Sequence, residues 1–569
     1  MKSALSMEMR GARPWDVIAT VLLLVVGVAT VLFTASLVFR LHVPLLAWDE
    51  WYIIYQFQSY AAGTYDWLAL AAQHNEHRIL LSRLLYFIDE IFFGLSGVFI
   101  LTVTIFLQIG NALILILLMS RLVKGWTRRC LLAGFVLMML FTLRQEQNFT
   151  NGFQVCFVGV FTTAALGIVA YVGGLERLKA IGGRPWIRFA MAALACAVST
   201  YTMANGVLTG CVLAVAALLW RAPWWVPAVT LALSAALAWL FFRDYVPGGS
   251  SLPLRQALID LLPYLHYVTA YLGNPLGSGV RTTQTFGTLG LLATAAGAWR
   301  VATGRERQPA SLVLLAIAGF IVASAVATAY GRILLGIGQA FESRYATLAE
   351  IFWTALVLFW YPVVTRPRAP WLGTVCLAAF MSLLGFSAIY FEVSAWPTLA
   401  ARATAFHHVS DSILSGVYDA EAASYENVTP DEVRLFLPFL REHRLSLFAG
   451  RAAESLGRNI AALGPVAPPG TCRGSVRAEA DLSLGQAGVR LSGDAWAETT
   501  NEYLRRIVIV AGSGAVVGFG TGALPGEAAR DWTGYATGDV GQTLDAYAQL
   551  ANGTSCELSR TDVKTSGSE

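Results

Sequence analysis

Two carboxylates lie between two tryptophans in the segment Trp48-Asp49-Glu50-Trp51. They follow directly on a long apolar run, so we expect them at the edge of a hydrophobic helix bundle. Aromatic rings anchor a protein at a membrane boundary, whereas acidic groups at that depth are costly and are often functional. Asp49 or Glu50 could act as a general base toward a hydroxyl, or could hold a divalent cation such as Mg, Mn or Ca. The simpler interpretation is a solvated turn with acidic charge at a helix start.

A second polar group follows in the segment Gln73-His74-Asn75-Glu76-His77-Arg78. His74 and His77 are three residues apart, which on a helix would allow both to bind one metal ion. A loop tied together by hydrogen bonds is the more frequent role of such a cluster. The intervening segment Ile53–Leu70 is aromatic and amphipathic, and it is long enough for a helix that lies on the membrane surface.

The segment 144–154 carries more polar side chains than a turn between two apolar helices needs. Within it, Glu146 could complete an acidic or metal-binding site together with Asp49. A well-solvated turn is the alternative.

Three arginines, Arg281, Arg332 and Arg344, stand in later loops next to apolar runs. Arginine suits phosphate binding at low dielectric because its planar fork forms two parallel hydrogen bonds. Arg344, which directly precedes Tyr345 and an apolar run, is the best phosphate candidate, and Arg332 is the second. The retention of basic residues in the cytoplasm does not explain these arginines, because their loops are predicted below to face outward.

The elements that must position these residues are membrane helices. The 569 residues are 56% hydrophobic and only 13% charged, with a mean hydropathy of +0.57, whereas soluble domains carry about 25% charged residues. The formal net charge of +4 is small and scattered, and it does not indicate nucleic-acid binding. A helix needs about 20 apolar residues to cross a bilayer. Such runs predict eleven spans, near residues 16–39, 92–119, 130–146, 153–173, 189–204, 206–220, 226–242, 286–302, 311–330, 347–364 and 371–391.

Lysine and arginine set the expected orientation, because cytoplasmic loops are enriched in them. With eleven spans, the N-terminus and every second loop are basic: Lys2, Arg10 and Arg13; Arg121, Lys124, Arg128 and Arg129; Arg177, Lys179, Arg184 and Arg188; Arg221; Arg300, Arg305 and Arg307; Arg366 and Arg368. The N-terminus is therefore predicted to be cytoplasmic, with the first run retained as an anchor because it lacks a signal-peptide cleavage site. The opposite side receives the loops 40–91, 144–152, 243–285 and 331–346, and the chain after 391.

Three regions are expected: a transmembrane domain at 1–391, a helical segment at 392–463 and a β-rich domain at 464–569. Thr429-Pro430-Asp431-Glu432 is a typical helix start, with a capping hydroxyl, a first-turn proline and two acids. After a linker rich in Gly and Pro at 464–470, short alternating runs with Gly turns predict a small sandwich or jelly roll. Its large aromatics could pack the core or form a carbohydrate-binding platform: Trp496, Trp532, Tyr535 and Tyr547.

Cysteine usage agrees with an exported C-terminal region. Five of the seven cysteines lie in apolar spans, where they serve as small buried hydrophobes. The other two, Cys472 and Cys556, bracket the β-rich domain, and we expect a disulfide between them, as is common in oxidising compartments.

Together these features resemble the membrane-embedded GT-C glycosyltransferases, which use polyprenyl-phosphate sugars as donors. The matching features are the acidic pair after the first span, a long first outward loop, Glu146 in the second and an outward C-terminal domain. The stretch 331–339, with Ser343-Arg344-Tyr345 and Phe352-Trp353, is also similar to bacterial membrane proteins grouped with that class. The sequence around Asp49 departs from the protein mannosyltransferase and lipid A aminoarabinose transferase patterns, so no acceptor is carried over.

The resemblance implies an inverting transfer at the outer face of the bacterial inner membrane, for cell-envelope assembly. The donor phosphate would bind Arg344, Arg332, Arg281 and Tyr345, with Asp49 as base and Glu50 and Glu146 as further catalytic candidates. A periplasmic glycan, lipid or protein would be the acceptor. Its binding residues would be His74, Glu76, His77, Arg78, Trp48 and Trp51. No nucleotide-binding fingerprint is present.

Two other functions remain open. A lipid-linked oligosaccharide polymerase or ligase would place its arginines and histidines in a late outward loop, but here the densest polar loop is the first one. A flippase or transporter would show ionisable residues within spans or an internal repeat; the spans are nearly free of charge and no repeat is evident.

Overall fold

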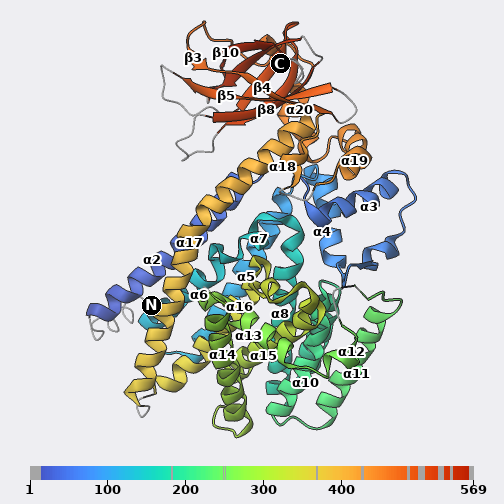
Figure 1. Ribbon diagram of the computed structural model, residues 1–569. Helices are drawn as coiled ribbons and strands as arrows, with labels where there is room; N and C mark the ends of the chain where they lie inside the picture. Colours follow the sequence, from blue (N-terminus) through green and yellow to red (C-terminus); the bar gives the residue numbers. More distant parts are fainter. Residues whose placement is uncertain are drawn as a thin grey trace. The chain divides into compact units, whose positions relative to one another are not determined.

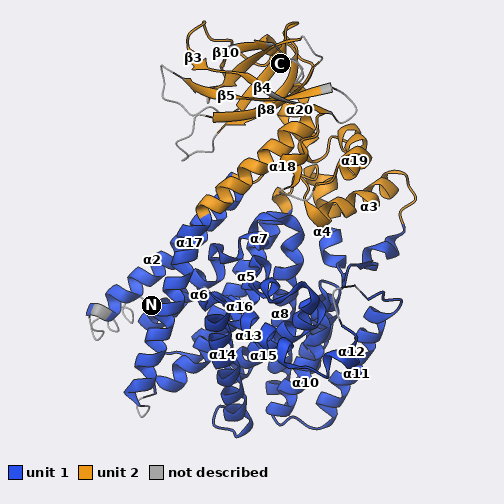
Figure 2. Ribbon diagram, in the orientation of Figure 1, with its two compact units in different colours: residues 1–40, 66–85, 100–395 blue, residues 41–65, 86–99, 396–569 orange. Residues whose placement is uncertain are grey.

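The computed structural model describes residues 14–180, 183–247, 249, 252–277, 279–366, 370–424, 428–483, 487–497, 506–522, 531–538, 542–550 and 552–562. The chain forms two compact units (Figure 2). Each unit is built from three segments, and the segments of the two units alternate along the sequence. The helical unit comprises Met1–Arg40, Asp66–Leu85 and Ile100–Ala395, and the mixed unit comprises Leu41–Tyr65, Tyr86–Phe99 and Trp396–Glu569. The basic residues Lys2, Arg10, Arg13 and Arg368, used above for orientation, lie outside the described residues.

Among the described residues, eight helices are long and apolar enough to cross a membrane, which indicates a multi-pass membrane protein. They are α2 (Pro14–Leu41), α5 (Val98–Leu122), α6 (Trp126–Phe141), α8 (Val155–Leu178), α11 (Trp225–Phe242), α15 (Pro309–Arg332), α16 (Ser343–Val364) and α17 (Trp371–Leu414) (Figure 1). The other three predicted spans are also helical: α9 (Trp186–Thr200), α10 (Thr209–Leu219) and α14 (Val280–Ala302). These three helices are not among those long and apolar enough to cross a membrane. Helices α9 and α10 are apolar but too short.

The helices of the helical unit differ in how much of their apolar surface is buried, and this distinguishes central helices from peripheral ones. Helices α8, α15 and α16 bury apolar residues nearly all round, as expected of helices at the centre of a bundle. Helix α11 leaves most of its apolar surface exposed, including Val229, Leu233 and Trp239, and this surface can contact lipid.

The segment between α2 and α5 differs from the single surface helix that was expected at Ile53–Leu70. Helix α3 (Trp51–Ala61) is followed by the short helix η2 (Trp67–Ala71), the hairpin strands β1 (Gln73–His74) and β2 (His77–Arg78), and helix α4 (Leu80–Phe93). Part of α3 is buried rather than exposed to lipid. Trp51, Ile54 and Phe57 lie on its buried face, and the ring of Trp51 stacks 5.9 Å from that of Phe436 within the mixed unit.

Helix α17 continues to Leu414, past the last predicted span, and is followed by α18 (Ala420–Ser424) and α19 (Pro430–Glu442). The predicted start of α19 is confirmed. The Oγ1 of Thr429 accepts a hydrogen bond from the Glu432 backbone N–H at 3.2 Å, and the Glu432 carboxylate accepts one from the Thr429 N–H at 3.0 Å. Short helices η9 (Ser446–Ala449), α20 (Arg451–Ser455) and η10 (Ile460–Ala462) lead to the sheet.

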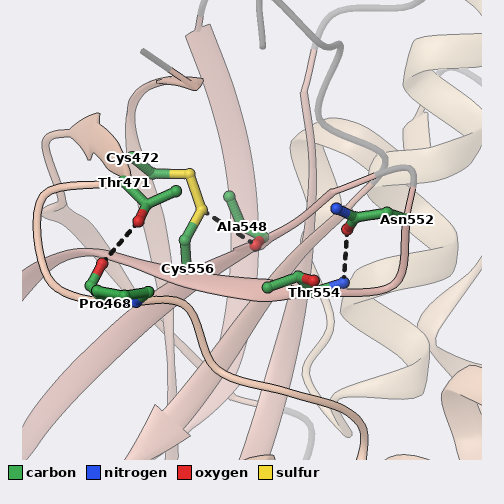
Figure 3. The surroundings of a disulfide bond; sticks show 7 residues. All are labelled: Pro468, Thr471, Cys472, Ala548, Asn552, Thr554 and Cys556. Atoms are coloured by element: carbon green, nitrogen blue, oxygen red, sulfur yellow. Dashed lines mark hydrogen bonds between the residues drawn. A yellow bond between two sulfur atoms is a disulfide. The ribbon is translucent and has the colours of Figure 1, made fainter. Parts of the chain in front are cut away.

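The β-rich region is one antiparallel sheet. Its described strands are β3 (Cys472–Gly474), β4 (Arg477–Ser483), β5 (Ala487–Ala497), β6 (Arg506–Ala511), β7 (Val516–Gly522), β8 (Asp531–Thr537), β9 (Thr543–Gln549) and β10 (Ser555–Asp562). They follow the order β10-β9-β6-β7-β8-β5-β3, with β4 also paired to β5. The predicted disulfide between Cys472 and Cys556 is present, with the two Cα atoms 5.8 Å apart (Figure 3). Because it joins β3 to β10, the two ends of the strand order, the sheet curls into an almost closed barrel.

Two of the four large aromatic residues of this region are buried inside the sheet. Trp532 packs in the apolar core with Leu491 and Ile509, and Tyr535 is also buried. The Tyr535 hydroxyl donates a hydrogen bond to Asp419 at 2.9 Å. Trp532 and Tyr535 are therefore core residues, not a surface platform for sugars.

Candidate functional site

A cavity of about 480 Å³ in the helical unit brings together several of the predicted site residues. Its wall is formed by the β1–β2 hairpin, the short helix η5 (Ala204–Leu208) and the ends of α11, α15 and α16, together with α13 (Leu262–Gly273). The charged groups in the wall are Glu76, Arg332 and Arg344. Polar side chains such as His77, Asn205, Tyr271 and Tyr345 also line it, and much of the remaining wall is aromatic or aliphatic.

The hairpin forms because its two-residue loop contains Asn75, which adopts a left-handed conformation (φ 48°) that asparagine tolerates. Arg78 then ties the hairpin to the end of α11. Its guanidinium donates to the backbone carbonyls of Ala71 (2.8 Å), Phe241 (2.7 Å) and Arg243 (2.5 Å). Because these contacts use all three of its nitrogens, we assign Arg78 to positioning the hairpin and not to binding a substrate.

Glu76 and Arg332 form an ion pair in the cavity. One guanidinium nitrogen of Arg332 lies 3.0 Å from the Glu76 carboxylate, and each side chain is less than a third exposed. Arg332 is the last residue of α15, where positive charge is favoured by the helix dipole. His77 lies beside this pair, and its Nδ1 faces the backbone N–H of Ala204 at 3.4 Å.

Arg344 lies in the first turn of α16, where the helix dipole disfavours a positive charge. Its Nη2 donates to the side chain of Gln339 at 3.1 Å, and its guanidinium carbon is 5.5 Å from the centre of the Tyr345 ring. Its Nε is buried and has no hydrogen-bond partner among the described residues. A cation at an unfavourable helix end, with a donor to spare, is available for an anionic ligand.

The polar segment 144–154 holds α16 in place. The Gln147 backbone N–H donates to Ser343 Oγ at 3.1 Å. The Asn148 amide donates to the Arg344 carbonyl at 2.9 Å and to Thr347 Oγ1 at 2.7 Å. Glu146 is half-buried at the start of α7 (Glu146–Thr150) and does not line the cavity. Polar groups of this segment therefore hold the first turns of α16, the helix that carries Arg344.

The acidic pair of the first loop belongs to the mixed unit. Glu50 is only 7% exposed, and its carboxylate accepts hydrogen bonds from the Tyr86 hydroxyl at 2.6 Å and the Ala47 backbone N–H at 2.9 Å. These contacts give Glu50 a structural role. Asp49 is half-buried in the short helix η1 (Trp48–Glu50). Trp48 begins that helix with a positive φ of 56°.

The remaining candidates are dispersed. Arg281 is exposed on α14 and does not line the cavity. The ring of His74 lies 5.3 Å from that of Phe153, and His74 is not in the cavity wall either. Among the described residues, no group of three or more His, Cys, Asp or Glu side chains is arranged to hold a metal ion. Asp49 and Glu146 belong to different units.

Sequence reasoning missed a buried ionisable group, Glu350, within the helical unit. Glu350 is 2% exposed in the middle of α16, within electrostatic reach of Arg144. Arg144 donates to the Asn274 side chain at 2.5 Å and stacks 3.9 Å from the Phe391 ring centre. The sequence did contain a signal for Glu350, which stands within the apolar run 347–364. A glutamate inside such a run is rare and is by default a functional candidate.

The chain matches no protein-family model, no curated protein and no solved structure. The likeness to GT-C glycosyltransferases therefore stays a prediction from sequence motifs and topology.

Proposed function

We propose that this protein is a membrane glycosyltransferase of GT-C type, which transfers a sugar from a polyprenyl-phosphate donor to a glycan, lipid or protein acceptor of the cell envelope. The observation that carries the proposal is that Arg332 and Arg344, from two different helices, line one cavity together with Glu76. Two guanidinium groups in a largely apolar wall suit a phosphate group, because each can form charge-assisted hydrogen bonds at low dielectric.

The charge of the cavity favours a monophosphate donor. Two guanidinium charges, from Arg332 and Arg344, and one carboxylate charge, from Glu76, leave a net charge of +1 (2 − 1). This complements the single negative charge of a sugar-phosphate diester. The donors of lipid-linked polymerases and ligases carry a diphosphate with about two negative charges, which one net positive charge would balance less well.

A second, apolar cavity supports a lipid donor. It has a volume of about 460 Å³ and is lined mainly by Ala, Leu, Val and aromatic side chains of α9, α10 and α11. Its wall extends along α11 as far as Leu240, and the next two residues, Phe241 and Phe242, line the charged cavity. An isoprenoid chain lying along α11 would bring its phosphate to Arg332 and Arg344.

The proposed reaction is a single displacement. The acceptor hydroxyl oxygen attacks the anomeric carbon, the bond from that carbon to the phosphate oxygen breaks, and the hydroxyl proton passes to a carboxylate. Polyprenyl phosphate leaves, and Arg332 and Arg344 stabilise the charge that develops on it. Asp49 is the base candidate from the sequence, and Glu76 is the carboxylate of the cavity itself.

The test is donor turnover by purified protein in bilayers. Polyprenyl phosphates carrying different labelled hexoses are supplied with an extract of envelope lipids and glycans, and the release of polyprenyl phosphate is measured. We expect Arg344→Gln to lower the release about 100-fold, whereas Arg281→Gln, at an exposed position outside the cavity, changes it less than about twofold. Wild-type release by Arg344→Gln and Arg332→Gln proteins would refute the proposal. Parallel Asp49→Asn and Glu76→Gln proteins identify the base, because only the loss of the true base abolishes turnover while lipid phosphate still binds.

The proposed placement is the bacterial inner membrane, with eleven spans, a cytoplasmic N-terminus and the C-terminal region on the periplasmic side. The Cys472–Cys556 disulfide supports this orientation, because such bonds persist in oxidising compartments.

A second candidate, a transporter of lipid-linked glycans, is favoured by the buried Glu350 and Arg144. Charges at this depth often mark a transport pathway. In that case Glu350→Gln should abolish transbilayer movement of a fluorescent lipid phosphate, while a glycosyltransferase should retain turnover in this variant.

A further inference from the structure

Three tyrosines occupy one face of α13, at positions 264, 267 and 271. The spacing of three and four residues places them above one another on consecutive turns. Tyr267 and Tyr271 are completely buried, each with a relative exposure of 0%, and Tyr264 is half-buried. We call these residues the α13 tyrosine row.

The hydroxyls of all three are buried and have no hydrogen-bond partner among the described residues. Several other buried or half-buried tyrosines among the described residues are paired. The hydroxyls of Tyr86, Tyr535, Tyr171 and Tyr418 bond to Glu50, Asp419, Thr230 and the Val428 carbonyl, respectively. A buried hydroxyl without a partner is costly. Three such hydroxyls on one helix face therefore indicate that their partners come from outside the chain.

The row adjoins the charged cavity. Tyr271 lines that cavity, and its ring centre lies 5.3 Å from the ring centre of Tyr345. Tyr267 is within electrostatic reach of Arg332, Arg344 and Tyr345. Tyr264 is within reach of Tyr330, another residue of the cavity wall.

The phenols are neutral hydrogen-bonding groups. Burial raises the pKa of Tyr267 and Tyr271 above the ordinary tyrosine value, so both keep their protons at neutral pH. A neutral phenol both donates and accepts, whereas an ionised phosphate only accepts. Sugar hydroxyls also do both, and they match the row better than a second anion would.

The spacing of the row also favours a sugar over a phosphate. Along α13, the seven residues from Tyr264 to Tyr271 cover about 10 Å. A phosphate group carries its oxygens on one atom and cannot reach three hydroxyls over this length. A hexose carries hydroxyls around its ring and extends from the phosphate to which it is attached.

We propose that the α13 tyrosine row binds the hydroxyl groups of the donor's sugar while Arg332 and Arg344 hold its phosphate. This inference rests on the proposed function, and it assigns sugar recognition to α13. Tyr271, which lines the cavity with both arginines, contacts the part of the sugar next to the phosphate, and Tyr264, at the other end of the row, contacts the part farthest from it.

The experiment compares binding of geranylgeranyl phosphate with that of its glucosyl, galactosyl, mannosyl and N-acetylglucosaminyl phosphodiesters, by titration of the purified full-length protein in detergent. We expect at least one sugar derivative to bind more tightly than geranylgeranyl phosphate. Tyr267→Phe and Tyr271→Phe should each weaken binding of that derivative about fivefold, and the double variant about 25-fold, because each removes one hydrogen-bonding group. Binding of geranylgeranyl phosphate should stay within about twofold of wild type, because the arginines are intact.

The matched control is Tyr390→Phe, which removes an exposed hydroxyl from α17 and should leave both affinities unchanged. Arg344→Gln should weaken both ligands together. If no derivative outbinds geranylgeranyl phosphate, or if the Tyr→Phe variants keep the wild-type preference, the row has no role in sugar binding, although the glycosyltransferase proposal survives. If geranylgeranyl phosphate itself does not bind, both proposals fail.

Discussion

The guanidinium of Arg332 lies 3.0 Å from the carboxylate of Glu76, although the two residues are 256 positions apart in the sequence. Glu76 comes from a hairpin loop and Arg332 from the end of a long apolar helix. Their pairing brings the β1–β2 hairpin to the two arginines of the cavity. It also explains why a loop dense in polar residues follows so soon after the first apolar run.

This ion pair should contribute modestly to stability. Because both side chains are partly exposed, a double-mutant cycle of Glu76→Gln and Arg332→Gln should give a coupling of about 0.5–1 kcal/mol in the free energy of unfolding. The same cycle on the exposed pair Asp431 and Arg434, at 3.7 Å on α19, should give about 0–0.5 kcal/mol. Coupling is measured by urea unfolding in detergent, and equal coupling in both pairs would contradict the assignment.

Substitution of Glu50 should lower the stability of the protein, whereas substitution of Asp49 should lower its turnover. Glu50→Ala leaves the Tyr86 hydroxyl and the Ala47 N–H without a partner, and it should cost about 2–4 kcal/mol of stability. Asp49→Asn should leave the melting temperature within a few degrees of wild type and affect only turnover, if Asp49 is the base. Thermal unfolding and donor release, measured on the same preparations, separate the two roles. A stable Glu50→Ala protein would show that its buried hydrogen bonds matter little.

Asp89 and Glu90 should contribute more to the stability of the mixed unit in mild acid than at alkaline pH. Burial raises the pKa of Asp89 to about 6 and that of Glu90 to about 7, above their values of about 4 in an unfolded chain. The folded state therefore binds these protons more tightly. The resulting stability is complete below about pH 4 and is lost as the pH rises through 6 and 7.

The pH dependence is checked by comparing unfolding midpoints at pH 5 and pH 8. Glu90→Gln should raise the midpoint at pH 8 and reduce the difference between the two pH values, because it removes a half-buried carboxylate. Glu442→Gln, at an exposed position at the end of α19, serves as the control and should leave the difference unchanged. A Glu90→Gln protein with the full wild-type difference would argue against this origin.

The disulfide should stabilise the curled sheet. Cys472→Ser with Cys556→Ser removes the link between β3 and β10, and it should cost about 2–4 kcal/mol. In unreduced protein, a thiol-reactive polymer should modify neither Cys472 nor Cys556, and both should become reactive after reduction and unfolding. Modification of these two before reduction would mean that the bond is absent in the cell.

The sequence alone determined the features that depend on local pattern. Apolar runs placed the eight described helices that are long and apolar enough to cross a membrane, because a helix that crosses lipid must satisfy its backbone internally and present apolar side chains over its length. The other three apolar runs are also helical. Thr429 and Glu432 marked a helix start through contacts three residues apart, and the only two cysteines outside apolar runs identified the disulfide. The choice of Arg332 and Arg344 as phosphate candidates also came from the sequence, and their role stays a prediction.

Only the tertiary structure decided which of the candidates meet. Glu76, Arg332 and Arg344 share a cavity, whereas Arg281 is exposed and lies outside it. The Glu50 carboxylate instead accepts hydrogen bonds from the Tyr86 hydroxyl and the Ala47 N–H. Such pairings join residues far apart in the chain, and no local periodicity encodes them. The α13 tyrosines show the same limit. Their spacing in the sequence is that of ordinary core residues, and their unpartnered hydroxyls became visible only when the surrounding helices were in place, because hydrogen bonding depends on neighbours in space.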